Sequence, residues 1–299
     1  MIEGEFKQKI KNQFHKMSIA HKMLAEYLLE NYENAAFLTA ARLGAIVGTS
    51  ESTVIRFASI LGYHGYPELQ EAMQEMVRRK LSTAARLRKI SDSARNFPVL
   101  SEIFLGDMQN LKKTFQNISE KAFEEAVDEI SNASTIYILG FRSAHCLALL
   151  LGFYLEMIGK KVKVIPSGVS SIYEQLSAVE ENDLVIGISF PRHTRQTIEG
   201  AEYAKNLGAK VMAITDTIVS PLAHWADITL TSESNIGSFM ESFAAPISLI
   251  NAIVTATGQK QREQTIAFLE KREETWKKCN IFYVAEKGSA EKIQKGKTK

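Results

Sequence analysis

The stretch TIYILGFRS at residues 135–143 is an apolar run that ends in a small polar turn, and the apolar helical run 144–158 follows it at once. A second unit of the same kind begins with LVIGIS at 184–189, and the polar turn 190–194 leads into a helical pattern that ends before Gly208. Repeated strand, turn and helix are typical of a parallel sheet whose faces are covered by helices. This part of the chain is therefore predicted to be an α/β domain.

Three further short apolar runs are predicted to complete a doubly wound sheet of about five parallel strands: 161–165, 210–215 and 228–230. Ligands bind such sheets outside the carboxyl ends of the strands, where the polar turns lie. The hydroxyls of Ser143, Ser189 and Thr194, with the backbone N–H groups of the helix starts, suit a phosphate or another anion. The alternative is that these hydroxyls only cap helices. Neither turn has a Walker or a Gly-x-Gly-x-x-Gly sequence, so no nucleotide motif is indicated.

The first part of the chain, residues 1–77, has the periodicity of helices throughout. The predicted helices span 6–14, 19–32, 40–47, 51–61 and 68–80. Their predicted N-caps are Ser18, Thr39 and Ser50, because each hydroxyl residue stands directly before a helical pattern.

Within this region, a short helix, a turn containing glycine and a second helix with a polar start form the helix-turn-helix pattern. Apolar residues of both helices are expected to pack in the angle between them: Leu43, Ile46, Val47, Val54 and Phe57. The exposed front of the second helix would then enter the major groove of DNA and contact base edges. The candidate DNA-binding residues are Thr49, Ser50, Glu51, Ser52, Thr53 and Arg56. The alternative is a plain helical bundle in which the Ser and Thr residues are only caps.

With 299 residues, 45% hydrophobic and 23% charged, the chain has the composition of an ordinary globular protein and the length for two domains. No apolar run reaches the roughly 18 residues of a membrane span, and the N-terminus lacks the features of a secretory signal. Cys146 and Cys279 lie too far apart to indicate a disulfide framework or a metal site, and Cys146 is expected to be buried. A reducing cytoplasm is the expected compartment, and no cofactor or metal is predicted.

Composition divides the chain into four expected parts: a helix-turn-helix domain at 1–77, a basic helical linker at 78–106, the α/β domain at 107–280 and a mobile tail at 281–299. Six Lys and Arg residues with no acid lie between 78 and 90, where they would favour contact with DNA phosphates. The predicted helices at 103–115 and 239–257 have more apolar surface than one face of the sheet can cover. They predict a homodimer or homotetramer.

Residues 40–57, AARLGAIVGTSESTVIRF, resemble the DNA-binding domain of the RpiR/MurR transcriptional regulators. Residues 61–69, LGYHGYPEL, resemble the same family's Leu-Gly-aromatic-x-Gly-aromatic-x-x-Leu signature. The resemblance implies that the helix around Ser52, Thr53 and Arg56 reads double-stranded operator DNA.

Residues 107 to about 257 resemble a sugar isomerase (SIS) domain, the phosphosugar-binding fold. The sequence GFRS at 140–143 matches the family's Gly-x-x-Ser, and residues 188–194 align with its Ser-x-Ser-Gly-x-Thr phosphate loop, of which the first Ser and the Thr are kept. Pro191 and Arg192 replace the second Ser and the Gly, so one hydroxyl is lost and a cation is gained that could pair directly with an anion. The ligand-binding residues implied by the resemblance are Arg142, Ser143, Ser189, Arg192, His193 and Thr194.

The expected function is therefore a DNA-binding regulator of carbohydrate metabolism, controlled by a phosphorylated or acidic sugar bound in the SIS domain. One alternative is a sugar-phosphate isomerase with an accessory helical domain, which needs a general base near the substrate. The candidates for that base are His193, His224, Glu233 and Glu241. Another alternative is a protein-interaction module whose pocket takes no ligand.

Overall fold

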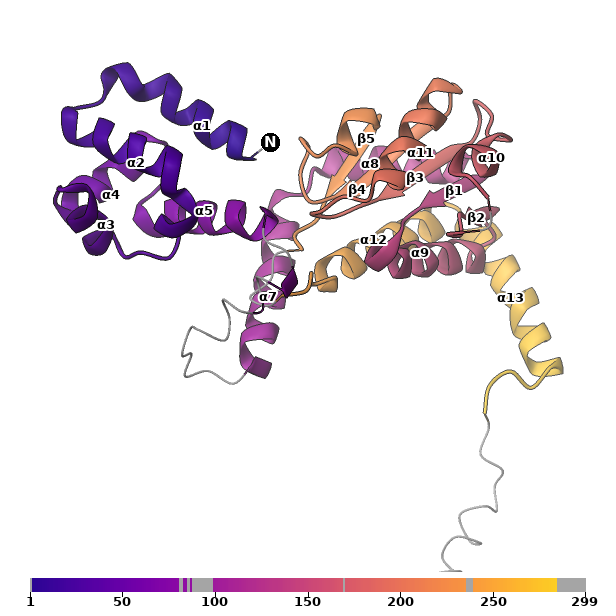
Figure 1. Cartoon of the computed structure of the whole chain (residues 1–299). Helices are drawn as coiled ribbons and strands as arrows, with labels where there is room; N and C mark the ends of the chain where they lie inside the picture. Colours follow the sequence, from indigo (N-terminus) through magenta and orange to yellow (C-terminus); the bar gives the residue numbers. More distant parts are fainter. Residues whose placement is uncertain are drawn as a thin grey trace, which may run out of the picture.

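The computed structural model describes residues 2–80, 83, 84, 87, 99–168, 170–234 and 239–283 of the chain. Within them, an N-terminal group of helices and a C-terminal group built on a sheet form two bodies, and helix α7 (Val99–Asn117) lies between them (Figure 1). One hydrophobic core extends from Phe6 to Val77, and separate cores pack on the two faces of the sheet. The chain thus folds around two centres, as its change of sequence pattern predicts.

The N-terminal body consists of α1 (Ile2–Gln13), α2 (Ile19–Ala35), α3 (Ala40–Val47), α4 (Glu51–Ile60) and α5 (Tyr66–Lys80). The predicted N-caps are confirmed. The hydroxyls of Ser18, Thr39 and Ser50 each accept a hydrogen bond from the backbone N–H of the residue three positions later. Such a cap stabilises a helix by about 1 kcal/mol. Gly48 ends α3 with a φ of 78°, in the left-handed region that favours glycine.

Helix α5 is tied to the connection between α2 and α3 by polar contacts. The hydroxyl of Tyr66 and the side-chain amide of Gln70 both donate to the carbonyl of Leu38, each at 2.7 Å. Burial raises the pKa of Tyr66 to about 12, so its hydroxyl remains a donor at every physiological pH. These bonds fix α5 beside the helix-turn-helix unit.

The angle between α3 and α4 is packed by Leu43, Val54 and Phe57, all fully buried. The prediction that Ile46 joins this contact is wrong, because its side chain is 46% exposed. The buried stripe of α3 is Ala40, Leu43, Gly44 and Val47, and position 46 lies at its edge. Gly44 takes the place in the contact that an apolar side chain was expected to fill.

Gly44 permits the close approach of α3 to the turn, and this leads to the first testable prediction. A Cβ atom at position 44 would lie 2.8 Å from the carbonyl oxygen of Thr49, closer than side chains approach backbone. Overpacking of this kind costs about 1–3 kcal/mol, so Gly44→Val should destabilise the N-terminal body by that amount. Calorimetric unfolding of the full chain checks this. The exposed neighbour supplies a control, Ala45→Ser, and equal melting of the two variants would refute the prediction.

The C-terminal body is built on the five-stranded parallel sheet that the sequence predicts. Its strands run in the order β2 (Val162–Val164), β1 (Ile136–Leu139), β3 (Leu184–Ile188), β4 (Lys210–Thr215) and β5 (Ile228–Thr231). Strands β1 and β3 are buried along their whole length, as expected of parallel strands covered on both faces.

Helices cover both faces of this sheet (Figure 1). One face carries α8 (Glu120–Asn132), α9 (His145–Met157) and α12 (Ala244–Lys260), and the other carries α10 (Ile172–Leu176) and α11 (Arg195–Asn206). The chain therefore leaves β1 toward one face and β3 toward the other. Between the carboxyl ends of two such neighbouring strands a crevice opens, which is where ligands bind in folds of this kind.

Two local expectations are corrected. The helix predicted from residue 239 begins only at Ala244. Just before it, the hydroxyl of Ser242 donates to the side chain of Asp107 and accepts from the N–H of Ala244. Cys146, expected in the core, is exposed, since the buried stripe of α9 runs through Leu147, Ala148 and Leu151. Its thiol donates to the carbonyl of Ser143.

Helix α13 (Arg262–Lys278) follows α12 and ends the regular structure of the part of the chain described here. None of the helices in that part has the length and apolar character that a bilayer crossing requires. Residues 91–98 of the predicted linker, the charged side chains at 78–90 and the predicted tail from 284 onward lie outside the described residues.

Candidate functional site

A cavity of about 430 Å³ opens where β1 and β3 end. Five of the six predicted ligand-binding residues line it: Arg142, Ser143, Ser189, Arg192 and Thr194. Arg142 and Ser143 belong to a short 3₁₀ turn after β1, and the other three belong to the loop between β3 and α11. The volume lies in the range of small-molecule sites, about 300–1,000 Å³.

Three further residues of the lining come from segments outside the two predicted turns. Thr83 comes from the segment after α5, and Met240 and Glu241 come from the segment before α12. Nothing in the local sequence marks these positions, since they reach the cavity through the packing of distant segments. Of the four candidate bases, Glu241 is the one that lines the cavity, whereas His224 is exposed on the 3₁₀ turn Ala223–Trp225.

Two hydroxyls in the cavity wall are not used by the fold. Thr194 occupies the N-cap position of α11, yet its side chain makes no capping hydrogen bond. Ser143 lies inside the 3₁₀ turn, exposed, and it caps no helix either. The alternative that these hydroxyls serve only as helix caps therefore does not hold for Ser143 and Thr194. The first N–H groups of α11 also remain available at this end of the helix.

Two arginines adopt backbone conformations that normally belong to glycine. Arg142 has a φ of 57° and Arg192 a φ of 64°, and among the described residues other than glycine only Asn280 shares this region. A residue held there costs roughly 1–3 kcal/mol, and such residues concentrate at ligand sites. Both arginines line the cavity, so strained backbone and positive charge coincide at one place.

Neither of these guanidinium groups pairs with an acid of the described chain. The Nη2 atom of Arg192 donates to the hydroxyl of Thr83 at 2.8 Å, across 109 residues of sequence. Glu241 supplies a carboxylate to the lining, and it already takes part in an interaction of its own. The electrostatic character of the cavity is accordingly cationic.

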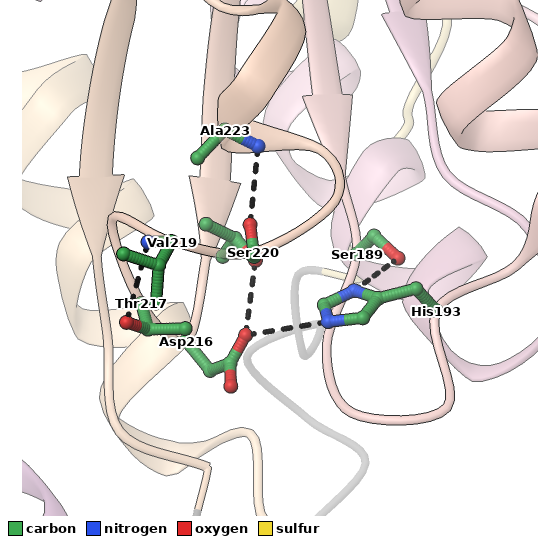
Figure 2. A network of polar contacts seen from close by, with 8 residues as sticks. Ser189, His193, Asp216, Thr217, Val219, Ser220 and Ala223 are labelled. Carbon is green, nitrogen blue, oxygen red and sulfur yellow. Dashed lines mark hydrogen bonds and ion pairs between the residues drawn. The ribbon is translucent and has the colours of Figure 1, made fainter. Parts of the chain in front are cut away.

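Behind the cavity wall stands a polar relay (Figure 2). The hydroxyl of Ser189 lies 3.1 Å from Nδ1 of His193, and Nε2 of His193 lies 3.5 Å from Oδ1 of Asp216 at the end of β4. Ser189 is 2% exposed, and the side chains of His193 and Asp216 are 14% and 5% exposed. His193 thus contacts the cavity through Ser189, and it is not part of the lining.

The same series of polar contacts continues into the turn that follows β4. The hydroxyl of Thr215 lies between Asp216 and Ser220, at 3.2 and 3.1 Å, and the hydroxyl of Ser220 accepts from the N–H of Ala223. Asp216 is therefore held from two sides, by the turn and by the imidazole. The sequence contained each of these residues but gave no sign that they meet.

The second candidate surface is the front of α4. Ser50, Glu51, Ser52 and Arg56 are exposed, and Thr49 and Thr53 are half-buried. The hydroxyl of Ser50 caps Thr53 and lies within 2.9 Å of the hydroxyl of Ser52. The exposed Arg56 makes no side-chain hydrogen bond or ion pair with the described residues, so its guanidinium is accessible to a ligand.

Metal binding has no support in the described residues, where no cluster of three or more His, Cys, Asp or Glu side chains is placed to hold an ion.

Comparison with known proteins matches each of the two bodies to a known domain family. The model of the helix-turn-helix domain of the rpiR family matches residues 4–80, and the model of the SIS domain matches residues 129–256. A HTH-type transcriptional regulator of Caldanaerobacter subterraneus is 25% identical over 263 residues, which are 84% of this chain and 89% of the relative. The regulator HexR of Pseudomonas aeruginosa is 23% identical over 257 residues, 83% of this chain and 87% of HexR.

Two solved structures share the fold. The sugar isomerase domain of an RpiR transcription factor from Sphaerobacter thermophilus is 27% identical, with a TM-score of 0.57 over 59% of this chain and 98% of that domain. The NanR protein of Vibrio vulnificus in complex with ManNAc-6P is 20% identical, with a TM-score of 0.57 over 91% of this chain and 97% of NanR. The two domain matches together span more than half of the chain. The chain therefore belongs to the RpiR family of transcriptional regulators, with an N-terminal helix-turn-helix domain and a C-terminal SIS domain.

Proposed function

We propose that this regulator binds operator DNA through the front of α4, and that a phosphorylated or acidic sugar in the cavity at the ends of β1 and β3 controls that binding. The observation that carries the proposal is the cavity itself. Its wall offers the hydroxyls of Ser143 and Thr194, which cap no helix, and two arginines that pair with no acid among the described residues. Groups of this kind recognise phosphate and carboxylate oxygens. The ManNAc-6P complex of NanR supports the same class of ligand.

The regulator would act in the cytoplasm as a homodimer or homotetramer. Helix α7 supports self-association, because it exposes large apolar side chains, of which Val99, Phe104 and Phe115 are 70%, 63% and 83% exposed. A dimer would present two α4 helices to half-sites about 34 Å apart, so a small rotation between subunits changes the fit to DNA.

The direct test measures DNA binding and effector response in the same assay. Duplexes selected from random sequence by the full-length protein are labelled, and fluorescence anisotropy gives the dissociation constant with and without a panel of sugar phosphates. The proposal requires sequence-specific, salt-sensitive binding whose affinity changes with at least one of these compounds. Binding without sequence preference, or affinity that no compound alters, would refute it.

Two of the contacts between the N-terminal and C-terminal parts of the described chain are expected to differ in importance. Arg192 meets Thr83 at the cavity, and Lys113 of α7 meets Glu71 of α5 at 2.8 Å on the surface. The first lies where the effector is proposed to bind, so occupancy of the cavity can act on the N-terminal body there. Since the second is exposed, it contributes about 0–1 kcal/mol and lies away from the cavity.

The variant Thr83→Val tests this coupling, because it removes the hydroxyl and keeps the shape. Effectors typically change DNA affinity by about 5- to 150-fold, and we expect this factor to fall close to one in the variant. Effector affinity itself should change by less than about tenfold, since Thr83→Val removes one neutral hydroxyl of the lining and leaves the other hydroxyls and both guanidinium groups in place. Lys113→Gln is the control and should respond to effector as the unmodified protein does. A Thr83→Val variant with full response would exclude this contact as the link.

Asp216 is expected to influence the effector through His193 and Ser189. The two ring nitrogens of His193 face Asp216 and Ser189, so Asp216 helps to hold the imidazole that orients the Ser189 hydroxyl at the cavity. Removing the carboxylate that faces Nε2 loosens this arrangement, so Asp216→Asn should weaken phosphosugar binding about tenfold, as measured by titration calorimetry. Asp227→Asn is the control, because Asp227 bonds to Lys205 and to the N–H of Val211 at the opposite edge of the sheet. Equal affinities in all three proteins would contradict the relay.

An isomerase remains the second candidate because Glu241, a carboxylate, lines the cavity. A general base must lie within hydrogen-bond reach of the substrate carbon it deprotonates. Incubation with aldose and ketose phosphates, followed by product analysis, tests this. Turnover that Glu241→Gln abolishes would establish an enzyme. If the compounds bind but are not converted, the isomerase is excluded and the regulator remains.

A further inference from the structure

An isoleucine stands in the middle of the polar front of α4. Ser52, Ile55, Arg56 and Ser59 are all exposed, and offsets of three, four and seven residues from Ser52 place them on one side of the helix. Recognition helices contact base edges with residues spaced in this way. Ile55 is the one apolar side chain among these four residues.

Ile55 does not contribute to the hydrophobic core of the N-terminal body. Its side chain is 43% exposed, whereas Val54, Phe57 and Ala58 are buried and Ile60 packs against the core. Isoleucine also favours a helix less than Ala, Leu, Glu or Lys, because its branched Cβ loses rotamer freedom there. Neither core packing nor helix formation therefore explains this residue.

The two serines of the same face are already engaged within the helix. The hydroxyl of Ser59 donates to the carbonyl of Ile55 at 3.5 Å, and the hydroxyl of Ser52 lies 2.9 Å from that of Ser50, which caps the helix. Arg56 makes no side-chain hydrogen bond or ion pair with the described residues. The face thus offers a ligand one cationic group and one apolar group side by side.

The major groove of DNA presents a partner for each of these groups. An arginine can bond to a guanine edge, and an aliphatic side chain can pack against the C5-methyl group that distinguishes thymine. The χ1 angle of an isoleucine is nearly fixed in a helix, so its methyl groups need little further ordering on binding. A docking protein would instead need a contiguous apolar patch, whereas the neighbours of Ile55 on this face are polar.

We propose that Ile55 reads a thymine in each operator half-site by packing against its C5-methyl group. This inference rests on the proposed function, since it assigns a further base contact to the same reading helix. It makes Ile55 a specificity-determining residue beside Arg56, and one that acts without charge.

Replacement of single thymines by deoxyuridine tests the inference, because it removes the methyl group and keeps every base-pair hydrogen bond. Each thymine of the duplex selected by the full-length protein is replaced in turn, and anisotropy titrations at fixed salt give the dissociation constants. At one position of a half-site, loss of the methyl group should weaken binding about fourfold. The other thymines should tolerate the change.

The variant Ile55→Ala assigns this effect to its residue. It should weaken binding to the thymine duplex about five- to tenfold, and it should bind the thymine and uracil duplexes equally within about twofold, because the partner of the methyl group is gone. The slope of log affinity against log salt should stay unchanged, since no charge is removed. Thermal melting verifies the fold.

Ile266→Ala is the matched control, because Ile266 lies on α13 in the C-terminal body and is 44% exposed. It should bind as the unmodified protein does and keep the fourfold preference for thymine.

The remaining outcomes each decide against the inference. If no replacement by uracil alters affinity, or if the fourfold effect persists in Ile55→Ala, Ile55 does not read a thymine, while sequence-specific binding of DNA stands. If selection from random duplexes yields no preferred sequence, the proposed function fails and this inference fails with it.

Discussion

Replacing Thr194 by aspartate is expected to abolish binding of a phosphorylated effector while the protein remains folded. Aspartate is among the best N-cap residues, and a carboxylate at a helix N-terminus is favourable, so α11 should be at least as stable as before. In the cavity, however, the new charge occupies the donors that the phosphate would use and repels it. Two unit charges about 4 Å apart interact by about 4 kcal/mol at an effective dielectric constant near 20, which corresponds to a loss of more than 100-fold.

A series at this position separates charge from shape. Thr194→Ser keeps the hydroxyl and should bind the effector almost normally, whereas Thr194→Asn matches aspartate in size without its charge and should lose about tenfold or less. Titration calorimetry provides the affinities, and thermal melting without ligand verifies the fold. The aspartate variant should still bind operator DNA but fail to respond to effector. Similar affinities for the Asn and Asp variants would show that Thr194 does not face an anion.

The sheet and the helix ends were predictable because their causes are local. Parallel strands buried on both faces consist of continuous apolar residues, and β1 and β3 lie inside the ranges that such runs marked. A hydroxyl directly before a helical pattern is sufficient to predict a cap, as at Ser50. The polar turns at the carboxyl ends of these strands then identified most of the cavity wall.

What the sequence did not indicate depends on contacts between distant segments. Thr83 reaches Arg192 across 109 residues, and Glu241 reaches the cavity from the segment before α12, about 50 residues after the loop that holds Arg192. The meeting of His193 with Asp216 requires the register of β3 beside β4. Neither periodicity nor composition contains such information, since both describe neighbours along the chain.

The left-handed arginines illustrate the same limit in the backbone. A sequence pattern shows that Arg192 stands in a loop, but a non-glycine residue with a positive φ is an exception that local preferences argue against. The structure adopts it where strand end, helix start and cavity all constrain the turn. Departures from local preference of this kind occur mainly at functional sites. Arg142 and Arg192 therefore indicate the ligand site more strongly than the neighbouring residues, whose backbone angles are ordinary.

At the other end of the molecule, replacing Arg56 is expected to have the largest effect on DNA binding. Its side chain is exposed on α4 and makes no hydrogen bond or ion pair with the described residues, so its removal should leave the helix intact. Arg56→Ala should weaken operator binding by about 1–3 kcal/mol if the guanidinium contacts a base edge. Arg56→Glu should weaken it further, because a negative charge then faces the phosphates. Anisotropy titrations with the selected duplex measure both.

The salt dependence of the same titrations distinguishes the two ways in which Arg56 could act. If it contacts a phosphate, Arg56→Ala weakens binding to all duplexes alike, and the slope of log affinity against log salt falls by about one. If it reads a base, preference for the operator over altered duplexes relaxes at one position while the slope changes little. Arg262→Ala, an exposed arginine at the start of α13, is the control and should bind as the unmodified protein does. Should Arg56→Ala also bind unchanged, α4 would not be the element that reads DNA through this residue.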